Sequence, residues 1–225
     1  MKQRFPQYVY NPITLFGATG LVGSFITLKL LDDNRYDKVK VFVRRSLEIV
    51  HSKLEENIVD FEKIDSWKEL LNGDELYSAL GTTIKKAGSK EAQYKIDFTF
   101  QYEIAKAASE NNVKKYLLVS SLGADYKSSN FYLRMKGNLD EKVQQLNFER
   151  IRIFRPSILI GLRSETRLGE TLGIKIAGVI TKIIPALKKY KPIKASLVAE
   201  AMIKSANQTT LEKIKIYQSE EIFYI

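Results

Sequence analysis

Three evenly spaced glycines follow the first apolar run of the chain, and this feature constrains the fold more than any other. The run begins at Ile13, and apolar residues recur at helical spacing after the last glycine, as far as Leu31. This pattern predicts a strand, a tight turn and a helix, an arrangement that binds a pyrophosphate at the start of the helix. The glycines allow the tight turn, the approach of phosphates to the backbone and the close packing of the helix on the strand. We therefore expect the turn to hold a dinucleotide through Gly17, Ala18, Thr19, Gly20, Leu21, Val22 and Gly23.

The rest of the chain alternates strands with helices, which indicates an α/β fold. After the glycine turn, apolar and β-branched runs predict strands at 38–43, 57–61, 75–80 and 115–121, and a final edge strand at 213–218. Helical spacing of apolar residues predicts helices at 92–112 and 196–207. At 225 residues the chain fits one domain, with a core at about 12–160 and a small C-terminal, substrate-side segment at about 161–225.

Composition excludes several classes of protein. The chain has no cysteine, so disulfides, thiolate metal sites and thiol nucleophiles are excluded, and we expect no metal site. The first residues lack the apolar core of a secretory signal, and no uninterrupted apolar segment is long enough to span a bilayer. We therefore expect a cytoplasmic protein. The net charge of +10 is spread along the chain without a nucleic-acid-binding signature, so we expect no specific nucleic-acid partner.

The end of the second expected strand bears on the choice of cofactor. In dinucleotide folds this position faces the adenosine ribose, where an acidic residue binds the 2′-hydroxyl of NAD(H). This chain has Arg44 and Arg45 there, and a guanidinium fork matches a phosphate. We therefore expect NADP(H) in preference to NAD(H). The alternative is a solvated strand end that carries two surface charges.

Two further strand ends carry candidate cofactor contacts. The third expected strand ends in an aspartate and a phenylalanine, which could bind and cover an adenine ring or could simply end the strand. The fourth runs into a glycine and a threonine, where the backbone allows close approach and a hydroxyl could reach phosphate or ribose. These candidates are Asp60, Phe61, Gly81 and Thr82.

Chemistry is expected where the fifth strand ends, at Ser120 and Ser121, because ligands collect at the carboxyl ends of parallel strands. Tyr132 and Lys136 follow, and on a helix they would share one face. A phenol with an ordinary pKa of about 10 is a poor acid or base at neutral pH, but a neighbouring ammonium stabilises its phenolate. We therefore expect a serine to hold the substrate oxygen while Tyr132 exchanges a proton with it.

Several separated motifs together resemble the short-chain dehydrogenase/reductase superfamily: Gly-Ala-Thr-Gly-Leu-Val-Gly at 17–23, Leu-Gly-Thr-Thr at 80–83, Ser-Ser-Leu-Gly-Ala-Asp at 120–125, Tyr-x-x-x-Lys at 132–136 and Arg-Pro at 155–156. The glycine spacing is similar to that of its extended or atypical branch. Lys-Ala-Gly at 86–88 and Lys-Ser-Ser-Asn-Phe at 127–131 are similar to the atypical subgroup that includes the Tat-interacting oxidoreductases.

The resemblance implies a three-layer Rossmann fold with a doubly wound, mostly parallel sheet and NADPH as cofactor. Matched by position, the catalytic residues would be Ser121, Tyr132 and Lys136, with Ser120 close enough to replace Ser121. The tyrosine and lysine would also lie at the nicotinamide ribose. Further cofactor contacts would come from the glycine turn and from Arg44, Arg45, Leu80, Gly81, Pro156, Leu159 and Arg167.

Two functions remain open at this point. The first is an NADPH-dependent oxidoreductase acting on a small carbonyl or alcohol; the second is an NADP(H)-binding regulator or scaffold with a protein partner. The segment 171–194 has six lysines and no carboxylate. It could receive an anionic substrate, a membrane surface or a protein, but we favour a helix that buries its apolar face and solvates its lysines. The oligomeric state, monomer or homodimer, is also open.

Overall fold

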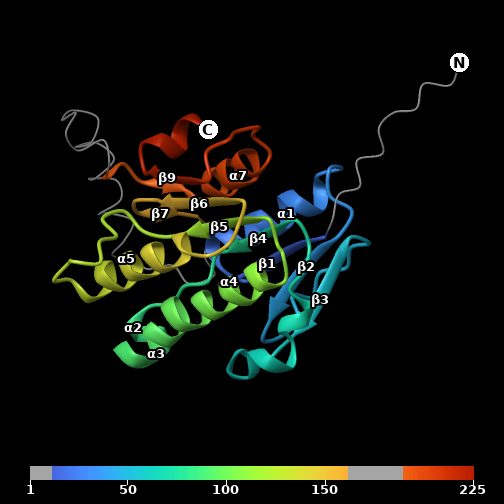
Figure 1. The fold of residues 1–225 in the computed structure, drawn as a ribbon, viewed down its shortest axis with the longest axis horizontal. Coiled ribbons are helices and arrows are strands. Elements are labelled where there is room, and N and C mark those ends of the chain that lie inside the picture. The colour runs from blue at the N-terminus through green and yellow to red at the C-terminus, as the bar shows by residue number, and fades with distance from the viewer. Residues whose placement is uncertain (1–11, 162–189) are drawn as a thin grey trace, which may run out of the picture.

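The computed structural model describes residues 12–161 and 190–225, and a seven-stranded sheet forms its centre (Figure 1). The strand order is β3-β2-β1-β4-β5-β6-β9, and all neighbouring strands are parallel. The order reverses between β1 and β4, and a ligand crevice opens at such a point in doubly wound sheets. The strands are β1 (Ile13–Phe16), β2 (Val39–Val43), β3 (Leu54–Ile58), β4 (Glu75–Ser78), β5 (Lys115–Val119), β6 (Arg150–Arg155) and β9 (Ile214–Gln218).

Helices cover both faces of the sheet, as the α/β prediction requires (Figure 1). On one face α1 (Leu21–Asp32) packs against α7 (Ala195–Ala206) and, with the 3₁₀ helix Glu221–Tyr224, closes one apolar core. On the other face α4 (Phe100–Glu110) and α5 (Phe131–Gln144) cover a second core. The central strands β1, β2 and β4 are buried along their whole length, which is typical of parallel strands covered on both faces. The predicted three-layer Rossmann fold is confirmed.

The helix predicted at 92–112 is present but is not regular. It consists of α3 (Lys90–Tyr94), a π-helical turn (Lys95–Thr99) and α4, with α2 (Ile84–Ala87) just before it. We call 90–110 the π-containing helix. A π turn adds a residue to the helical cycle and often marks a functional position. No pattern of residues in this segment indicated the turn.

The third strand was predicted at the wrong place. It runs from Leu54 to Ile58 rather than over 57–61, and all its residues are at least partly exposed because β3 is an edge strand. The 3₁₀ helices Phe61–Ser66 and Lys68–Leu70 follow it. The other predicted strands and helices lie within a few residues of their expected positions, including the final edge strand β9. Most of the lysine-rich segment lies outside the described residues.

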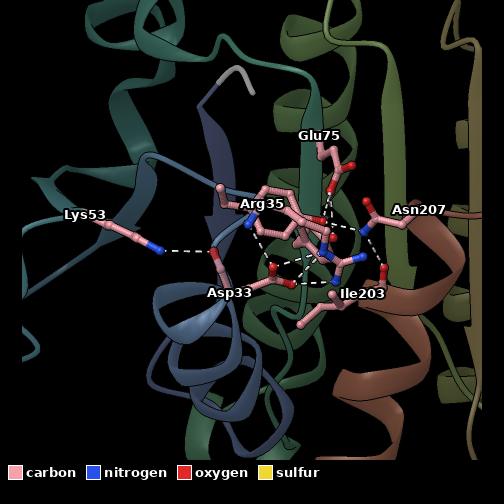
Figure 2. A network of polar contacts seen from close by, with 8 residues as sticks. Asp33, Arg35, Lys53, Glu75, Ile203 and Asn207 are labelled. Atoms are coloured by element: carbon pink, nitrogen blue, oxygen red, sulfur yellow. Dashed lines mark hydrogen bonds and ion pairs between the residues drawn. The ribbon is translucent and has the colours of Figure 1, made fainter. Parts of the chain in front are cut away.

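A polar network ties α1, α7 and the sheet together at the amino ends of the strands (Figure 2). Glu75, the first residue of β4, is buried and accepts hydrogen bonds from the hydroxyls of Tyr77 at 2.7 Å and Tyr36 at 3.2 Å. Lys115 Nζ lies 2.8 Å from the same carboxylate. Asn207, which ends α7, donates to the Tyr36 hydroxyl at 2.7 Å. The network fixes the amino ends of the strands, whereas the site is expected at their carboxyl ends.

Candidate functional site

The glycine turn passes directly over the point where the sheet order reverses. Gly17 has a φ of +84°, and a Cβ there would overlap the backbone of Ala79 just after β4. The amide of Gly20 donates to the Gly17 carbonyl at 2.8 Å, which closes the turn. A Cβ on Gly23 would overlap the same carbonyl. The tight turn at Gly17 and the close helix packing at Gly23, both predicted from the glycine spacing, are therefore present in the fold, and the approach of a pyrophosphate to this backbone stays a prediction.

The amino terminus of α1 is open to an anion. Gly20 is its N-cap residue, with no side chain to satisfy the first amides of the helix, and the first turn contains no acidic residue. Free amides and the helix dipole favour a phosphate at such an end. The turn residues that precede it differ in burial, with Ala18 buried and Thr19 exposed. The arrangement fits the pyrophosphate of a dinucleotide.

The two arginines predicted to select the cofactor, Arg44 and Arg45, follow β2 directly and are exposed. Neither forms an ion pair with another described residue, so both guanidinium groups are available to a ligand. Asp60 and Phe61 do not end a strand as predicted. Asp60 caps the next 3₁₀ helix by accepting from the amide of Glu62, and the Phe61 ring packs among other aromatic rings. Their proposed adenine contacts stay a prediction.

The loop after β4 faces the glycine turn and is held by the π-containing helix. Leu80 is partly buried in the second core, and Gly81 is exposed. The amide of Thr82 donates to Asp97 Oδ2 at 2.8 Å, and its carbonyl accepts from Gln93 Nε2 at 3.1 Å. Asp97 lies in the site but was not predictable from the sequence, because it belongs to no recognisable motif.

The two serines after β5 face different surroundings. Ser120 is buried, and its hydroxyl lies near Asp140, a buried carboxylate that also holds Arg155 at 2.9 Å. Ser121 is only partly buried, and its hydroxyl has a single long contact of 3.4 Å, to the carbonyl of Leu122. The Ser121 hydroxyl is thus available to a ligand, whereas the Ser120 hydroxyl is buried near Asp140.

Tyr132 and Lys136 lie one helical turn apart on α5, as predicted. Tyr132 is 36% exposed, and its hydroxyl has no hydrogen bond to another described residue. Lys136 is 3% exposed, and its Nζ lies 3.5 Å from Asp97 Oδ1. Burial alone lowers the pKa of Lys136, but the charge of Asp97, with smaller effects of Tyr132 and Asp140, raises that pKa above its ordinary value. The site therefore pairs an accessible phenol with a buried amine that stays charged.

The segment after β6 completes the site. Pro156 is buried, and its carbonyl accepts from the amide of Leu122, so the exits of β5 and β6 run together. Leu159 begins β7 (Leu159–Ile160), which pairs with β8 (Ile193–Lys194). A Cβ on Gly161 would overlap the side chain of Leu21 at the start of α1, so this segment reaches the glycine turn. Arg167 lies outside the described residues.

These features define a dinucleotide-binding protein of the Rossmann class. Its parallel sheet carries a glycine turn where the strand order reverses, α1 begins with an open terminus, and a tyrosine lies beside a buried lysine. A family model described as NAD(P)H-binding matches residues 17–150, and the chain belongs to this family.

Two curated relatives illustrate its place within the family. The mitochondrial protein fmp52 of Emericella nidulans is 32% identical over 220 residues, which cover 95% of this chain and 94% of that protein. Protein HTATIP2 of Rattus norvegicus is 35% identical over 170 residues, which cover 74% of this chain and 70% of that protein. The resemblance to the atypical subgroup is confirmed.

Solved structures share the fold at low sequence identity. UDP-glucose 4-epimerase of Thermus thermophilus, solved with NAD, has a TM-score of 0.67 at 14% identity, and the match covers 95% of this chain and 81% of the epimerase. WbmH of Bordetella bronchiseptica, solved with NAD⁺, has a TM-score of 0.69 at 14% identity, and the match covers 93% of this chain and 76% of WbmH. These likenesses identify the short-chain dehydrogenase/reductase fold.

The expected cytoplasmic location is wrong. The fmp52 relatives from Emericella nidulans, Aspergillus niger and Meyerozyma guilliermondii are named as mitochondrial proteins. The expectation came from the lack of an apolar secretory core, but mitochondrial transit peptides are amphipathic and arginine-rich and need no such core. Within 12–161 and 190–225, no helix is both long and apolar enough to cross a membrane.

Proposed function

We propose that this protein is an NADP(H)-dependent oxidoreductase that transfers a hydride to or from the carbon of a small carbonyl or alcohol. The observation that carries the proposal is the accessible phenol of Tyr132 beside the buried, charged amine of Lys136. The pair lies at the carboxyl ends of the strands, as does the glycine turn. The nicotinamide supplies or accepts the hydride when it is bound.

The chain's own residues have separate tasks in this proposal. The amides at the start of α1 hold the pyrophosphate, and the exposed Arg44 and Arg45 hold the 2′-phosphate, which favours NADP(H) over NAD(H). Ser121 donates a hydrogen bond to the substrate oxygen. In carbonyl reduction Tyr132 gives its proton to that oxygen while the carbonyl carbon gains the hydride, and Lys136 stabilises the phenolate that remains.

A titration and a turnover assay test this function. Trp67 is the single tryptophan of the chain and packs against Phe16 and Phe42 near the carboxyl ends of β1 and β2, so its fluorescence can report binding. We expect NADPH to bind more tightly than NADH and to be consumed with at least one member of a panel of aldehydes, ketones and quinones. Absence of binding would refute the proposal.

A second candidate is an NADP(H)-binding regulator whose cofactor occupancy alters contacts with a protein partner. The observation in its favour is that Lys136 is already held by Asp97, so its amine has a role in the fold without any reaction. Tight NADPH binding with no consumption across the panel would favour this candidate. The names of the fmp52 relatives support a mitochondrial location for either function.

A further inference from the structure

Asp97 is a buried carboxylate that joins two parts of the site from outside every sequence motif. It is 1% exposed and lies in the π turn of the helix 90–110. Its Oδ1 is 3.5 Å from Lys136 Nζ, and its Oδ2 accepts the amide of Thr82 at 2.8 Å. One side chain therefore contacts both the amine beside Tyr132 and the loop after β4.

The backbone around Asp97 is also fixed. Gln101 Nε2 donates to the Asp97 carbonyl at 2.8 Å, and Gln101 Oε1 accepts from the Ser78 hydroxyl at the end of β4, also at 2.8 Å. Both glutamine contacts are buried. The sheet thereby sets the position of the π turn, and the π turn sets the position of the carboxylate.

The charges that face Lys136 come from several elements. The helix α5 itself contributes the Tyr132 phenol and the Asp140 carboxylate, and the π-containing helix contributes the Asp97 carboxylate. Asp140 is shared with Arg155 on β6, at 2.9 Å, and lies near the Ser120 hydroxyl. Asp97 has no second cation among the described residues. It is therefore the main counter-charge that keeps a buried ammonium ionised.

We propose that Asp97 is the positioning residue that holds Lys136 in its charged form at the cofactor site and so sets the upper pH limit of the reaction. Its effect on the amine is independent of turnover, and only the effect on the reaction rests on the proposed function. Without the carboxylate, burial would favour loss of the Lys136 proton. The support for the Tyr132 phenolate would then disappear at a lower pH.

The test is a titration of Lys136 in the protein without cofactor. Lysine Nζ resonances of ¹⁵N-labelled protein are followed against pH, and Lys136→Arg identifies the signal. In Asp97→Asn, whose amide oxygen can still accept the Thr82 amide, we expect the pKa of Lys136 to fall by at least about one unit. Asp97→Glu should recover part of that fall, and Glu103→Gln on α4 should leave the pKa unchanged. An unchanged Lys136 pKa in Asp97→Asn would overturn the proposal.

Wild-type protein gives a second readout that does not require the variant to fold. When the Asp97 carboxyl takes up its proton at low pH, its Cγ resonance and the Lys136 Nζ resonance should shift at the same pH; independent shifts would contradict the proposal. If the enzyme turns over, the alkaline limb of kcat/KM should move to lower pH in Asp97→Asn. If no substrate is consumed, the proposed function fails while the two titrations still decide the role of Asp97.

Discussion

The carbonyl oxygen of Gly17 occupies the space in which a Cβ of Gly23 would lie. This contact joins the strand β1 to the helix α1 without room for any side chain. Gly23→Ala should therefore either displace α1 or destabilise the fold, by about 1–3 kcal/mol for overpacking. Urea unfolding measures the loss, and NADPH titration should show weaker binding.

Gly81→Ala is the matched control for this substitution. Gly81 is exposed, and the nearest atom to its added Cβ is Asp97 Oδ1 at 3.5 Å, an ordinary van der Waals contact. We expect its unfolding free energy to stay within about 0.5 kcal/mol of wild type. Equal stability of the Gly23 and Gly81 variants would contradict the packing argument.

The arginines after β2 should determine the choice between NADPH and NADH. Replacing Arg44 and Arg45 by serine removes both exposed guanidinium groups and should weaken NADPH binding about 10- to 100-fold, the value of charge-assisted hydrogen bonds to a phosphate. NADH, which lacks that phosphate, should lose little. The exposed Lys106→Ser on α4 serves as the charge control. Equal losses for both cofactors would show that the arginines do not bind the 2′-phosphate.

Glu75 should contribute to stability and not to catalysis. Its removal in Glu75→Ala leaves the Tyr36 and Tyr77 hydroxyls and the Lys115 amine without their shared acceptor. We expect a loss of about 2–4 kcal/mol in unfolding free energy, reduced from the full cost of a buried pair because Lys115 is partly exposed. The exposed Glu69→Ala should cost almost nothing. Similar unfolding midpoints for the two variants would argue against the network.

Substitution of the two serines after β5 should change different measured quantities, kcat for one and the unfolding free energy for the other. Ser121→Ala removes the donor that we propose for the substrate oxygen and should lower kcat about 10²-fold with little change in stability. Ser120→Ala removes a hydroxyl from the buried cluster of Asp140 and should act first on the unfolding free energy. The reverse pattern would assign the substrate contact to Ser120. Steady-state kinetics and thermal unfolding on the same samples distinguish the two cases.

Local chemistry made the glycine turn and the Tyr132–Lys136 pair predictable. Glycine spacing reports a steric demand on neighbouring residues, and the separation of the tyrosine and lysine fixes them on one helical face. The buried strands were also predictable, because a strand covered on both faces requires a nearly continuous run of apolar residues. β3 was misplaced because an edge strand such as Leu-Glu-Glu-Asn-Ile has too few apolar residues to identify it.

Contacts between distant segments were not predictable. Asp97 meets Lys136 and Thr82 only because the π turn and the sheet bring three separate segments together, and nothing in the residues near Asp97 predicts that turn. The same holds for the surroundings of Ser120, whose hydroxyl lies near Asp140 of α5. A strand end predicts that hydroxyls are available but not which one faces the interior.

NADPH oxidation with a carbonyl panel tests the role of Tyr132 most directly, and it is measured for wild type, Tyr132→Phe and the exposed control Tyr224→Phe. We predict turnover by wild type and Tyr224→Phe, and a loss of at least about 10²-fold in Tyr132→Phe, with its NADPH dissociation constant almost unchanged. Turnover by Tyr132→Phe at the wild-type rate would contradict the assignment of Tyr132 as the acid and base of the site.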